Sequence, residues 1–526
     1  MVRNRLLALI GVTMGLGLIA AGCGGDSSDS DSDASATVIR GTTDQPISYD
    51  PAGAYDLPSY DGIYSMYQNL LTIEPGGNEA VPEAAESCDF SDKANKVFEC
   101  TMKDGLTFSD GSDLTAEDVK FSFDRNVEIA DPNGASSLLA NMKSVEAPDD
   151  KTVVFNLKAS DATWPLVLTT ASFAIVPSDS YPADKLQPSE EVIGSGRYTL
   201  SEYQAGQQTV MEKNTEYQGD AAAANERVII QYFDKASPLK LAVEQGDVDI
   251  AYRSLSPTDI DDLDGAEGVN VVSGNGTEIR YLTFNTELQP GDDDAQKLAI
   301  RQAAAQVIDR QAIADNVYNG TVQPLYSMVP QGVEYATDSF ATEYGDAPDV
   351  DAATQTLEDA GVDTPVPLEV WWTPSHYGTA SGDEYAEIKR QLDESGLFDV
   401  TLKSTEWNQY STAAFTDKYP TYQLGWFPDY PDADDYTASF YAPDSFLNIH
   451  YDDPEMNKLL AEEKGSDDPA VRSKAFERIQ QIGAEDAPTV PIWQADQVAA
   501  VRDGVEGVEE TFDPSFIFRF WLISKS

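Results

Sequence analysis

Apolar and polar residues alternate with two different periods along most of the chain. Residues 151–158 place Val153, Phe155 and Leu157 on one face, which is the period of a half-buried strand. Residues 61–71 instead repeat their apolar positions every three or four residues, as a helix with one buried face does. Both periods recur from residue 37 onward, so the pattern predicts an α/β protein.

The same criteria predict the remaining elements. Strands are expected at residues 37–41, 96–102, 198–203, 208–213, 228–233, 248–252, 368–372, 400–404, 422–424, 489–493 and 516–523. Helices are expected from a cap at Thr115 to Arg125, and at residues 238–245, 295–317 with a break at 309–310, 383–394 and 459–482. The strand–helix–strand succession at 228–252 implies parallel strands, and three such blocks predict several domains.

One segment, residues 425–436, concentrates aromatic, proline and acidic side chains directly after the expected strand at 422–424. Pro428 and Pro431 cannot continue a helix and remove two backbone donors. We therefore expect a stiff loop at the end of a strand, and we call residues 425–436 the aromatic–acidic loop.

Asp429 is the candidate binding residue of this loop. It stands among Trp426, Phe427 and Tyr430, in surroundings expected to be drier than bulk water. A carboxylate among aromatic rings can receive an ammonium group, because the ion pair and the ring faces both attract a cation. A proline-rich turn with a structural aromatic cluster is the alternative, and the residues alone leave both interpretations open.

Length and charge narrow the class of protein. The chain has 526 residues, which predicts two or three domains. Its 91 Asp and Glu against 34 Lys and Arg give a formal charge of −57. This charge excludes nucleic acids and anionic lipid surfaces as partners, since both would be repelled. Because the acidic residues are spread along the whole chain, we interpret them as a solvated coat rather than a site for cations.

The N-terminal segment predicts export. Residues 1–22 form a signal peptide in which two arginines precede an apolar run at 6–19, too short for a stable membrane anchor. The small residues before Cys23 resemble a bacterial lipobox, so we expect lipid at Cys23 and a position on the outer face of the cell membrane or in the periplasm. Residues 23–36 are nearly all Gly, Ser, Asp and Ala and are expected to be a flexible tether. An ordinary cleaved signal peptide is the alternative.

Export also bears on the oxidation state of the other two cysteines. Cys88 and Cys100 lie at the two ends of a short polar segment. In an oxidising compartment this spacing predicts a disulfide across a hairpin. Two thiols without a nearby histidine are too few ligands for a metal site.

Nothing in the sequence indicates an enzyme. It contains no Gly-x-Ser-x-Gly elbow, no His-Glu-x-x-His and no phosphate-binding Gly-Lys-Ser/Thr. His376 has no evident partner nucleophile. Asp432, Asp434 and Asp435 offer oxygen ligands for calcium, but the loop lacks the glycine and the distal glutamate of an EF-hand. We expect no cofactor and no metal.

Several segments in a fixed order resemble one bacterial family. They are 49–51 (Tyr-Asp-Pro), 81–87 (Val-Pro-Glu-Ala-Ala-Glu-Ser), 108–122 (Phe-Ser-Asp-Gly-Ser-Asp-Leu-Thr-Ala-Glu-Asp-Val-Lys-Phe-Ser), 194–198 (Gly-Ser-Gly-Arg-Tyr), 300–303 (Ile-Arg-Gln-Ala) and 308–310 (Ile-Asp-Arg). Each is weak alone, but together they resemble the extracellular solute-binding proteins of family 5, the oligopeptide-, dipeptide- and nickel-binding components of ABC importers. The resemblance spans residues 37–526.

This resemblance implies a two-lobed α/β fold like that of periplasmic binding proteins (type II, Venus-flytrap), with an extra subdomain in the first lobe. The expected division assigns 37–55, 179–283 and 490–526 to the core of the first lobe, 56–178 to the extra subdomain and 284–489 to the second lobe.

The resemblance also implies a binding site. In peptide binders of this family an aspartate in a Trp-x-x-Asp-Tyr loop pairs with the ligand's α-ammonium, a role that falls on Asp429. The other implied ligand-binding residues are Trp426, Trp407, Tyr430, Tyr410, and the backbone of Asp56 and Leu57, which would pair with an extended ligand. Between the two tryptophans only Lys418 is basic, so carboxylate recognition and peptide length stay open.

The implied function is capture of a peptide by closure of the lobes, followed by delivery to a membrane permease whose ATPase subunits are separate chains. The protein is expected to work as a monomer. The alternative is the same fold binding a sugar, an opine or a metal chelate, for which Asp429 would be incidental. A secreted hydrolase is a more distant alternative.

Overall fold

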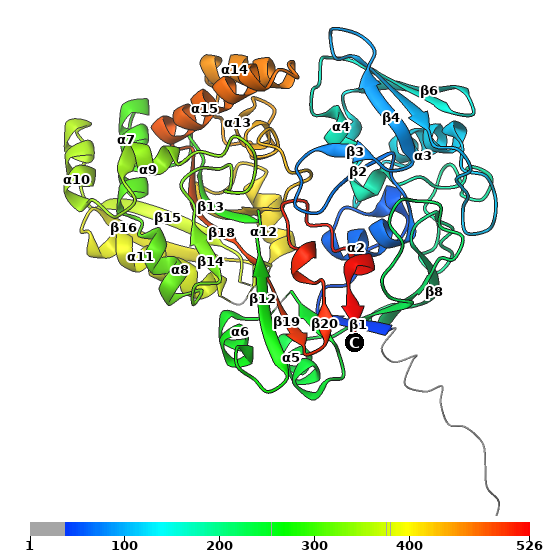
Figure 1. Ribbon diagram of the computed structural model, residues 1–526. Helices are drawn as coiled ribbons and strands as arrows, with labels where there is room; N and C mark the ends of the chain where they lie inside the picture. Colours follow the sequence, from blue (N-terminus) through cyan, green and yellow to red (C-terminus); the bar gives the residue numbers. More distant parts are fainter. Residues whose placement is uncertain (1–36, 254, 375, 379) are drawn as a thin grey trace, which may run out of the picture.

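A computed structural model describes residues 37–253, 255–374, 376–378 and 380–526 (Figure 1). The predicted signal peptide, the tether and Cys23 lie outside the described residues. Three large sheets organise the described chain. The four-stranded sheet lies at the upper right of Figure 1, the seven-stranded sheet at the bottom and the six-stranded sheet on the left. We call the part built on the first two sheets the first lobe and the part built on the third the second lobe.

The seven-stranded sheet of the first lobe has the order β12-β19-β11-β1-β10-β9-β8. Its strands are β1 (Thr37–Thr42), β8 (Tyr198–Gln204), β9 (Gln208–Lys213), β10 (Arg227–Tyr232), β11 (Ile250–Tyr252), β12 (Val269–Gly274) and β19 (Gln497–Arg502). The helix α5 (Ala236–Gln245) connects β10 to β11, and both strands pair parallel with β1, which lies between them. The predicted parallel unit is confirmed, with one strand inserted into it.

The four-stranded sheet has the order β4-β5-β7-β6 and is antiparallel. Its strands are β4 (Ala85–Phe90), β5 (Val97–Met102), β6 (Met142–Asp149) and β7 (Thr152–Leu157). Helices α2 (Leu57–Met66), α3 (Ala116–Ile129) and α4 (Trp164–Val167), and the short pair β2 (Leu71–Ile73) and β3 (Ala80–Pro82), belong to the same region. Buried side chains of this region and of the seven-stranded sheet form one continuous core.

A buried ion pair ties α3 to the turn that follows β1. Arg125 and Asp50 are 3% and 1% exposed, and two hydrogen bonds of 2.8 and 2.5 Å join the guanidinium to the carboxylate. The Asp50 carboxylate also accepts from the backbone N–H of Ala52 and of Gln187. These four hydrogen bonds satisfy the buried carboxylate and fix the turn against the helix.

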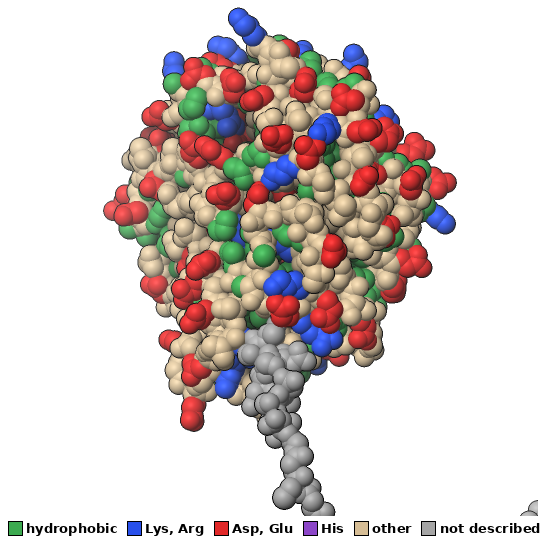
Figure 2. Space-filling model, turned by 45° about the vertical axis from the view of Figure 1, so that its right-hand side comes forward, with side chains coloured by type: hydrophobic (Ala, Val, Ile, Leu, Met, Phe, Trp, Pro, Cys, Tyr) green, Lys and Arg blue, Asp and Glu red, His purple; other side chains and the backbone are tan. Residues whose placement is uncertain are grey.

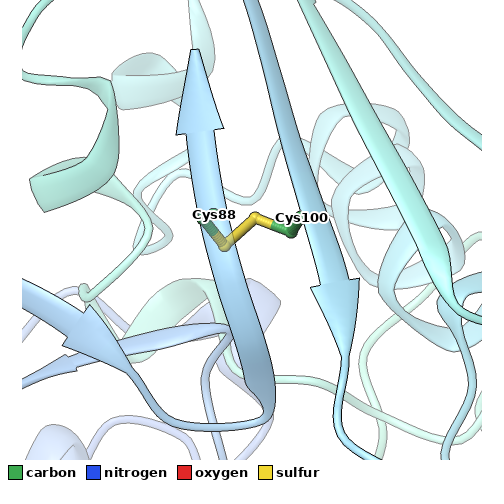
Figure 3. Close-up of a disulfide and its surroundings, with 2 residues drawn as sticks. All are labelled: Cys88 and Cys100. Atoms are coloured by element: carbon green, nitrogen blue, oxygen red, sulfur yellow. A yellow bond between two sulfur atoms is a disulfide. The ribbon is translucent and has the colours of Figure 1, made fainter. Parts of the chain in front are cut away.

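The predicted disulfide is present. Cys88 and Cys100 are directly opposite one another on β4 and β5, and their sulfurs are bonded (Figure 3). Five residue pairs join these two antiparallel strands, so the bond crosses a hairpin as the spacing predicted.

The second lobe is built on a six-stranded sheet of order β14-β18-β13-β17-β15-β16. Its strands are β13 (Ile279–Phe284), β14 (Val322–Pro324), β15 (Val366–Trp372), β16 (Phe398–Ser404), β17 (Thr421–Trp426) and β18 (Thr489–Ala495). Its helices are α7 (Asp294–Val307), α8 (Arg310–Asn316), α9 (Ser339–Tyr344), α10 (Val350–Asp359), α11 (Ser381–Glu394), α12 (Trp407–Ala414), α13 (Ala438–Tyr441), α14 (Pro454–Lys464) and α15 (Pro469–Asp486).

The lobes are linked by short segments of chain. Residues 275–278 lead from β12 to β13, and Asp496 separates β18 from β19. Each link therefore joins a strand of one large sheet to a strand of the other. Such short links are where a hinge between lobes would bend. The division of the lobes by residue number stays a prediction.

Three predicted elements need correction. The helix expected at 459–482 is two helices, because Asp468 caps a new helix that starts at Pro469. The helix expected at 61–71 starts four residues earlier, after a cap at Asp56, and ends at Met66. The strand expected at 516–523 is wrong: this stretch holds a 3-10 turn at Phe520–Leu522, and its aromatic residues enter the core without strand pairing.

The surface carries the acidic residues that the composition predicted. Figure 2 shows Asp and Glu spread over one whole face, with fewer Lys and Arg among them. This distribution agrees with a solvated acidic coat. Over the described part of the chain, no helix combines the length and the apolar character that crossing a membrane requires.

Candidate functional site

The aromatic–acidic loop begins at the end of β17, as predicted, and it is fixed by buried contacts. Tyr436 is fully buried, and its hydroxyl donates to the carbonyl of Thr277, in the link between β12 and β13, at 2.8 Å. Trp426 ends β17 and stacks on Phe446 with ring centroids 5.2 Å apart. The loop is thus held at the junction of the two lobes.

Asp429 receives a hydrogen bond from the other lobe. The hydroxyl of Tyr55, which precedes α2 in the first lobe, donates to Oδ1 of Asp429 at 2.5 Å. Thr170, also of the first lobe, donates through its hydroxyl to the carbonyl of Asp429 at 3.5 Å. Asp429 therefore lies on the seam between the lobes.

A second carboxylate lies behind Asp429. Asp435 is 2% exposed, and its Oδ2 accepts from the backbone N–H of Asp429 at 2.9 Å and from Nε1 of Trp426 at 3.0 Å. Burial, followed by the negative charge of Asp429, raises the pKa of Asp435 well above its usual range. Asp435 thus orients Asp429 through its backbone N–H, and the raised pKa of Asp435 reflects both its burial and the repulsion between the two carboxylates.

The carboxylate of Asp429 is half-buried and has no cation of its own. Burial raises the pKa of Asp429 to about 6, against which the hydrogen bonds with Tyr55 and Asp435 act. Among the described residues, no Lys, Arg or His makes an ion pair with Asp429 or Asp435. A partly desolvated carboxylate without a counter-ion favours any ligand that brings a positive charge.

The other acidic residues of the loop are already paired. Arg472 donates two hydrogen bonds to Asp432, at 2.9 and 2.7 Å. Asp434 accepts from Lys464 at 3.2 Å and from the hydroxyl of Tyr430 at 2.9 Å. These contacts give Asp432, Asp434 and Tyr430 structural roles. In the part of the chain that the structure describes, no group of three or more His, Cys, Asp or Glu is placed to hold a metal.

Trp407 and Tyr410 form a separate aromatic group in the second lobe. Trp407 is half-buried and lies flat on His376, with ring centroids 3.6 Å apart and an angle of 3° between the planes. Tyr410 is fully buried, and its hydroxyl donates to the carbonyl of Gln423 at 2.7 Å. Loss of water around the ring, followed by the charge of Arg280, lowers the pKa of His376 to about 4.

Asp56 and Leu57 start α2 on the side of the first lobe. The carboxylate of Asp56 accepts from the backbone N–H of Ser59 at 2.9 Å and from its hydroxyl at 2.7 Å, as a helix cap does. Burial raises the pKa of Asp56 to about 6, while these hydrogen bonds with Ser59 lower it. The carbonyl of Asp56 accepts from the N–H of Tyr60 at 3.1 Å. Leu57 is half-buried.

Of the predicted site residues, the structure therefore brings Asp429, Trp426 and Tyr430 together, while Trp407 and Tyr410 belong to the second group. Sequence analysis missed the side chain of Tyr55 and the role of Asp435. Tyr55 is 374 residues from Asp429, so no local pattern could have linked them. The sequence did offer a hint for Asp435, because it is one of three aspartates in the four residues after Pro431.

Two surface pockets lie elsewhere. One of about 450 Å³ is lined by residues between Ser180 and Glu191, and one of about 210 Å³ lies between α6 (Pro257–Leu263) and Asn319. Neither is lined by the aromatic–acidic loop. At Asp429 the lobes are in contact through the hydrogen bond that Tyr55 donates to Oδ1.

Comparison with known proteins agrees with this architecture. The chain is 25% identical over 491 residues to the di/tripeptide-binding protein 3 of Pseudomonas aeruginosa, covering 87% of this chain and 90% of that protein. The structure superimposes with a TM-score of 0.80 and 25% identity on the ABC transporter substrate-binding protein CtaP of Listeria monocytogenes, covering 93% of this chain and 99% of that one. The structure of Agrobacterium AgaA in complex with agropinic acid superimposes with a TM-score of 0.76 and 23% identity. This match covers 93% of this chain and 99% of AgaA.

These likenesses confirm the predicted two-lobed α/β fold. The family itself is shown by the model of the bacterial extracellular solute-binding proteins, family 5 (middle), which matches residues 79–448. Its members bind solutes and are not enzymes. On this evidence the chain belongs to the bacterial extracellular solute-binding proteins of family 5.

Proposed function

We propose that this protein captures short peptides between its lobes and that Asp429 receives their α-ammonium group. One observation carries the proposal: Asp429 is a half-buried carboxylate, without an ion-pair partner among the described residues, at a point where both lobes meet. The name of the Pseudomonas di/tripeptide-binding relative supports the same ligand class.

An ammonium group suits this carboxylate for a physical reason. Burial has already made the ionised form of Asp429 costly, and a ligand cation removes that cost when it binds. A charge pair with hydrogen bonds in such surroundings is worth roughly 2–5 kcal/mol when one partner is removed. A neutral ligand group gives only an ordinary hydrogen bond.

The other predicted residues complete the proposed site. Trp426 and Trp407 would pack against ligand side chains. Tyr410, whose ring centroid lies 6.0 Å from that of Trp407, would support it, and Tyr430 would hold the loop in place through Asp434. The backbone near Asp56 and Leu57 would pair with an extended ligand. Binding would favour the closed arrangement of the lobes, and the closed form would dock on the permease of an ABC importer.

The N-terminal sequence supports a location for this function. The chain would be exported, cleaved before Cys23 and held to the outer face of the membrane by lipid at that residue. It would act as a monomer, with ATP hydrolysis in separate subunits.

Calorimetry on the chain from residue 24 onward tests the proposal. The ligands are alanine di- to pentapeptides and the same peptides acetylated at the N-terminus, which removes the ammonium charge. We expect the free peptides to bind at least about 30-fold more tightly than the acetylated ones. Asp429→Asn should erase this difference.

The matched control is Asp486→Asn. Asp486 also accepts from a tyrosine hydroxyl, that of Tyr451 at 2.8 Å, and burial also raises its pKa. This variant should keep the preference for free peptides. Equal binding of free and acetylated peptides by the unchanged chain, or no binding of either, would contradict the proposed ligand.

A further inference from the structure

The hydrogen bond between Tyr55 and Asp429 joins one fixed backbone segment of each lobe through a partly exposed side chain. Tyr55 is 40% exposed, although its neighbours are held in place. The carbonyl of Ala54 accepts from the hydroxyl of Ser172 at 2.5 Å, and Asp56 caps α2. The ring of Tyr55 therefore takes its position mainly from the bond between its hydroxyl and Asp429.

The contact is also one of the few hydrogen bonds that cross the seam between the lobes. Among the described residues, and apart from bonds of the linking segments themselves, the others are the N–H of Ala162 to the carbonyl of Lys464 at 2.8 Å, Nδ2 of Asn78 to the carbonyl of Gly332 at 3.3 Å, and the bond from Thr170 to the carbonyl of Asp429. These three end on carbonyl oxygens. Only the bond from Tyr55 ends on the carboxylate proposed to bind the ligand, among the described residues.

We infer that Tyr55 is an internal competitor of the ligand: its hydroxyl occupies Asp429 in the ligand-free protein and must leave before an ammonium group can bind. This inference rests on the proposed function of Asp429. A phenol O–H bonded to a carboxylate is a charge-assisted hydrogen bond, which is stronger than a neutral one. This bond lowers the fraction of molecules in which Asp429 is free. The observed association constant is the intrinsic one multiplied by that fraction.

The same contact holds the lobes together without ligand. The bond between Tyr55 and Asp429 links the two lobes at the same place where a bound ligand would link them. The ligand-free protein therefore spends part of its time closed, and the ligand replaces an internal bond rather than filling an open space.

The test is Tyr55→Phe, which removes the hydroxyl and keeps the ring. We expect alanine peptides with a free N-terminus to bind about tenfold more tightly than to the unchanged chain. Small-angle scattering of the ligand-free variant should give a larger radius of gyration, and peptide should restore the smaller value. A melting curve establishes that the variant is folded.

Tyr451→Phe is the matched control, because it removes a tyrosine–aspartate bond that lies within the second lobe. Its affinity and radius of gyration should match those of the unchanged chain. Unchanged or weaker binding by Tyr55→Phe overturns the inference, since the hydroxyl would then be inert or part of the ligand's own site. If the unchanged chain shows no preference for free over acetylated peptides, the proposed function fails instead.

Discussion

Lowering the pH should weaken ligand binding through Asp429. The pKa of this carboxyl is raised to about 6 in the ligand-free protein, above its ordinary value of 3.8. Only the ionised form pairs with an ammonium group, so binding lowers the pKa and releases a proton wherever the free carboxyl is protonated. Affinity is therefore full above pH 7 and falls as the pH drops through 6.

The magnitude follows from the pKa. At pH 7.5 nearly all of Asp429 is ionised, whereas at pH 5 about one tenth is. The dissociation constant should rise about tenfold between these two values, which is about 1.4 kcal/mol. Because Asp429 and Asp435 interact, the midpoint belongs to the pair. The peptide's own amino group has an ordinary pKa of about 7.7–8.0, so it is fully protonated at pH 5 and still mostly protonated at pH 7.5.

Calorimetry in buffers of different ionisation enthalpy measures both the affinity and the number of protons released. We expect close to one proton released per peptide at pH 5. At pH 7.5 we expect no release, and the uptake of a fraction of a proton by the peptide's amino group. Asp429→Asn should bind weakly and with no pH dependence. An affinity that is constant, or that rises, from pH 7.5 to pH 5 would refute the reasoning.

Three further predictions concern stability. Asp435→Asn should raise the free energy of unfolding at pH 7.5 by on the order of 1–3 kcal/mol, because a buried carboxylate with a raised pKa is lost. Urea titrations should show this gain shrinking as the pH falls to 4 and vanishing below about pH 3, where the unfolded carboxyl is protonated as well. Arg125→Met should cost about 3–5 kcal/mol in the same assay, since it leaves a buried carboxylate unpaired, whereas Lys120→Met on the exposed side of α3 should cost under about 0.5 kcal/mol; equal losses would contradict this. The double variant Cys88→Ser/Cys100→Ser should lose about 3 kcal/mol, and a loss that persists when both proteins are reduced would exclude the disulfide as its cause.

Much of the fold could be predicted because local pattern and tertiary structure agree. The alternation at 152–157 and the break before Arg310 both have local causes, namely a half-buried sheet and the cap at Asp309. The stretch at 516–523 has no such cause. Its apolar residues are buried on all sides around Arg519, which is 1% exposed and pairs with Asp513, so continuous hydrophobicity could not distinguish a strand from an irregular core segment.

The candidate site could be predicted only in part for a similar reason. The aromatic–acidic loop is local, and its sequence pointed to Asp429. Its three other aspartates differ in whether a cation distant in sequence pairs with them. Arg472 pairs with Asp432, and Lys464 pairs with Asp434. Among the described residues, no cation pairs with Asp435, which is buried. Which carboxylate remains available to a ligand is therefore decided by tertiary contacts.

A crystal structure of the protein with a bound alanine peptide tests the central claim most directly. The account predicts that the peptide lies between the lobes, with its terminal nitrogen within about 3 Å of a carboxylate oxygen of Asp429. The hydroxyl of Tyr55 should have moved away from that carboxylate. A complex in which the terminal nitrogen contacts another group, while the bond between Tyr55 and Asp429 remains as it is here, would contradict the account.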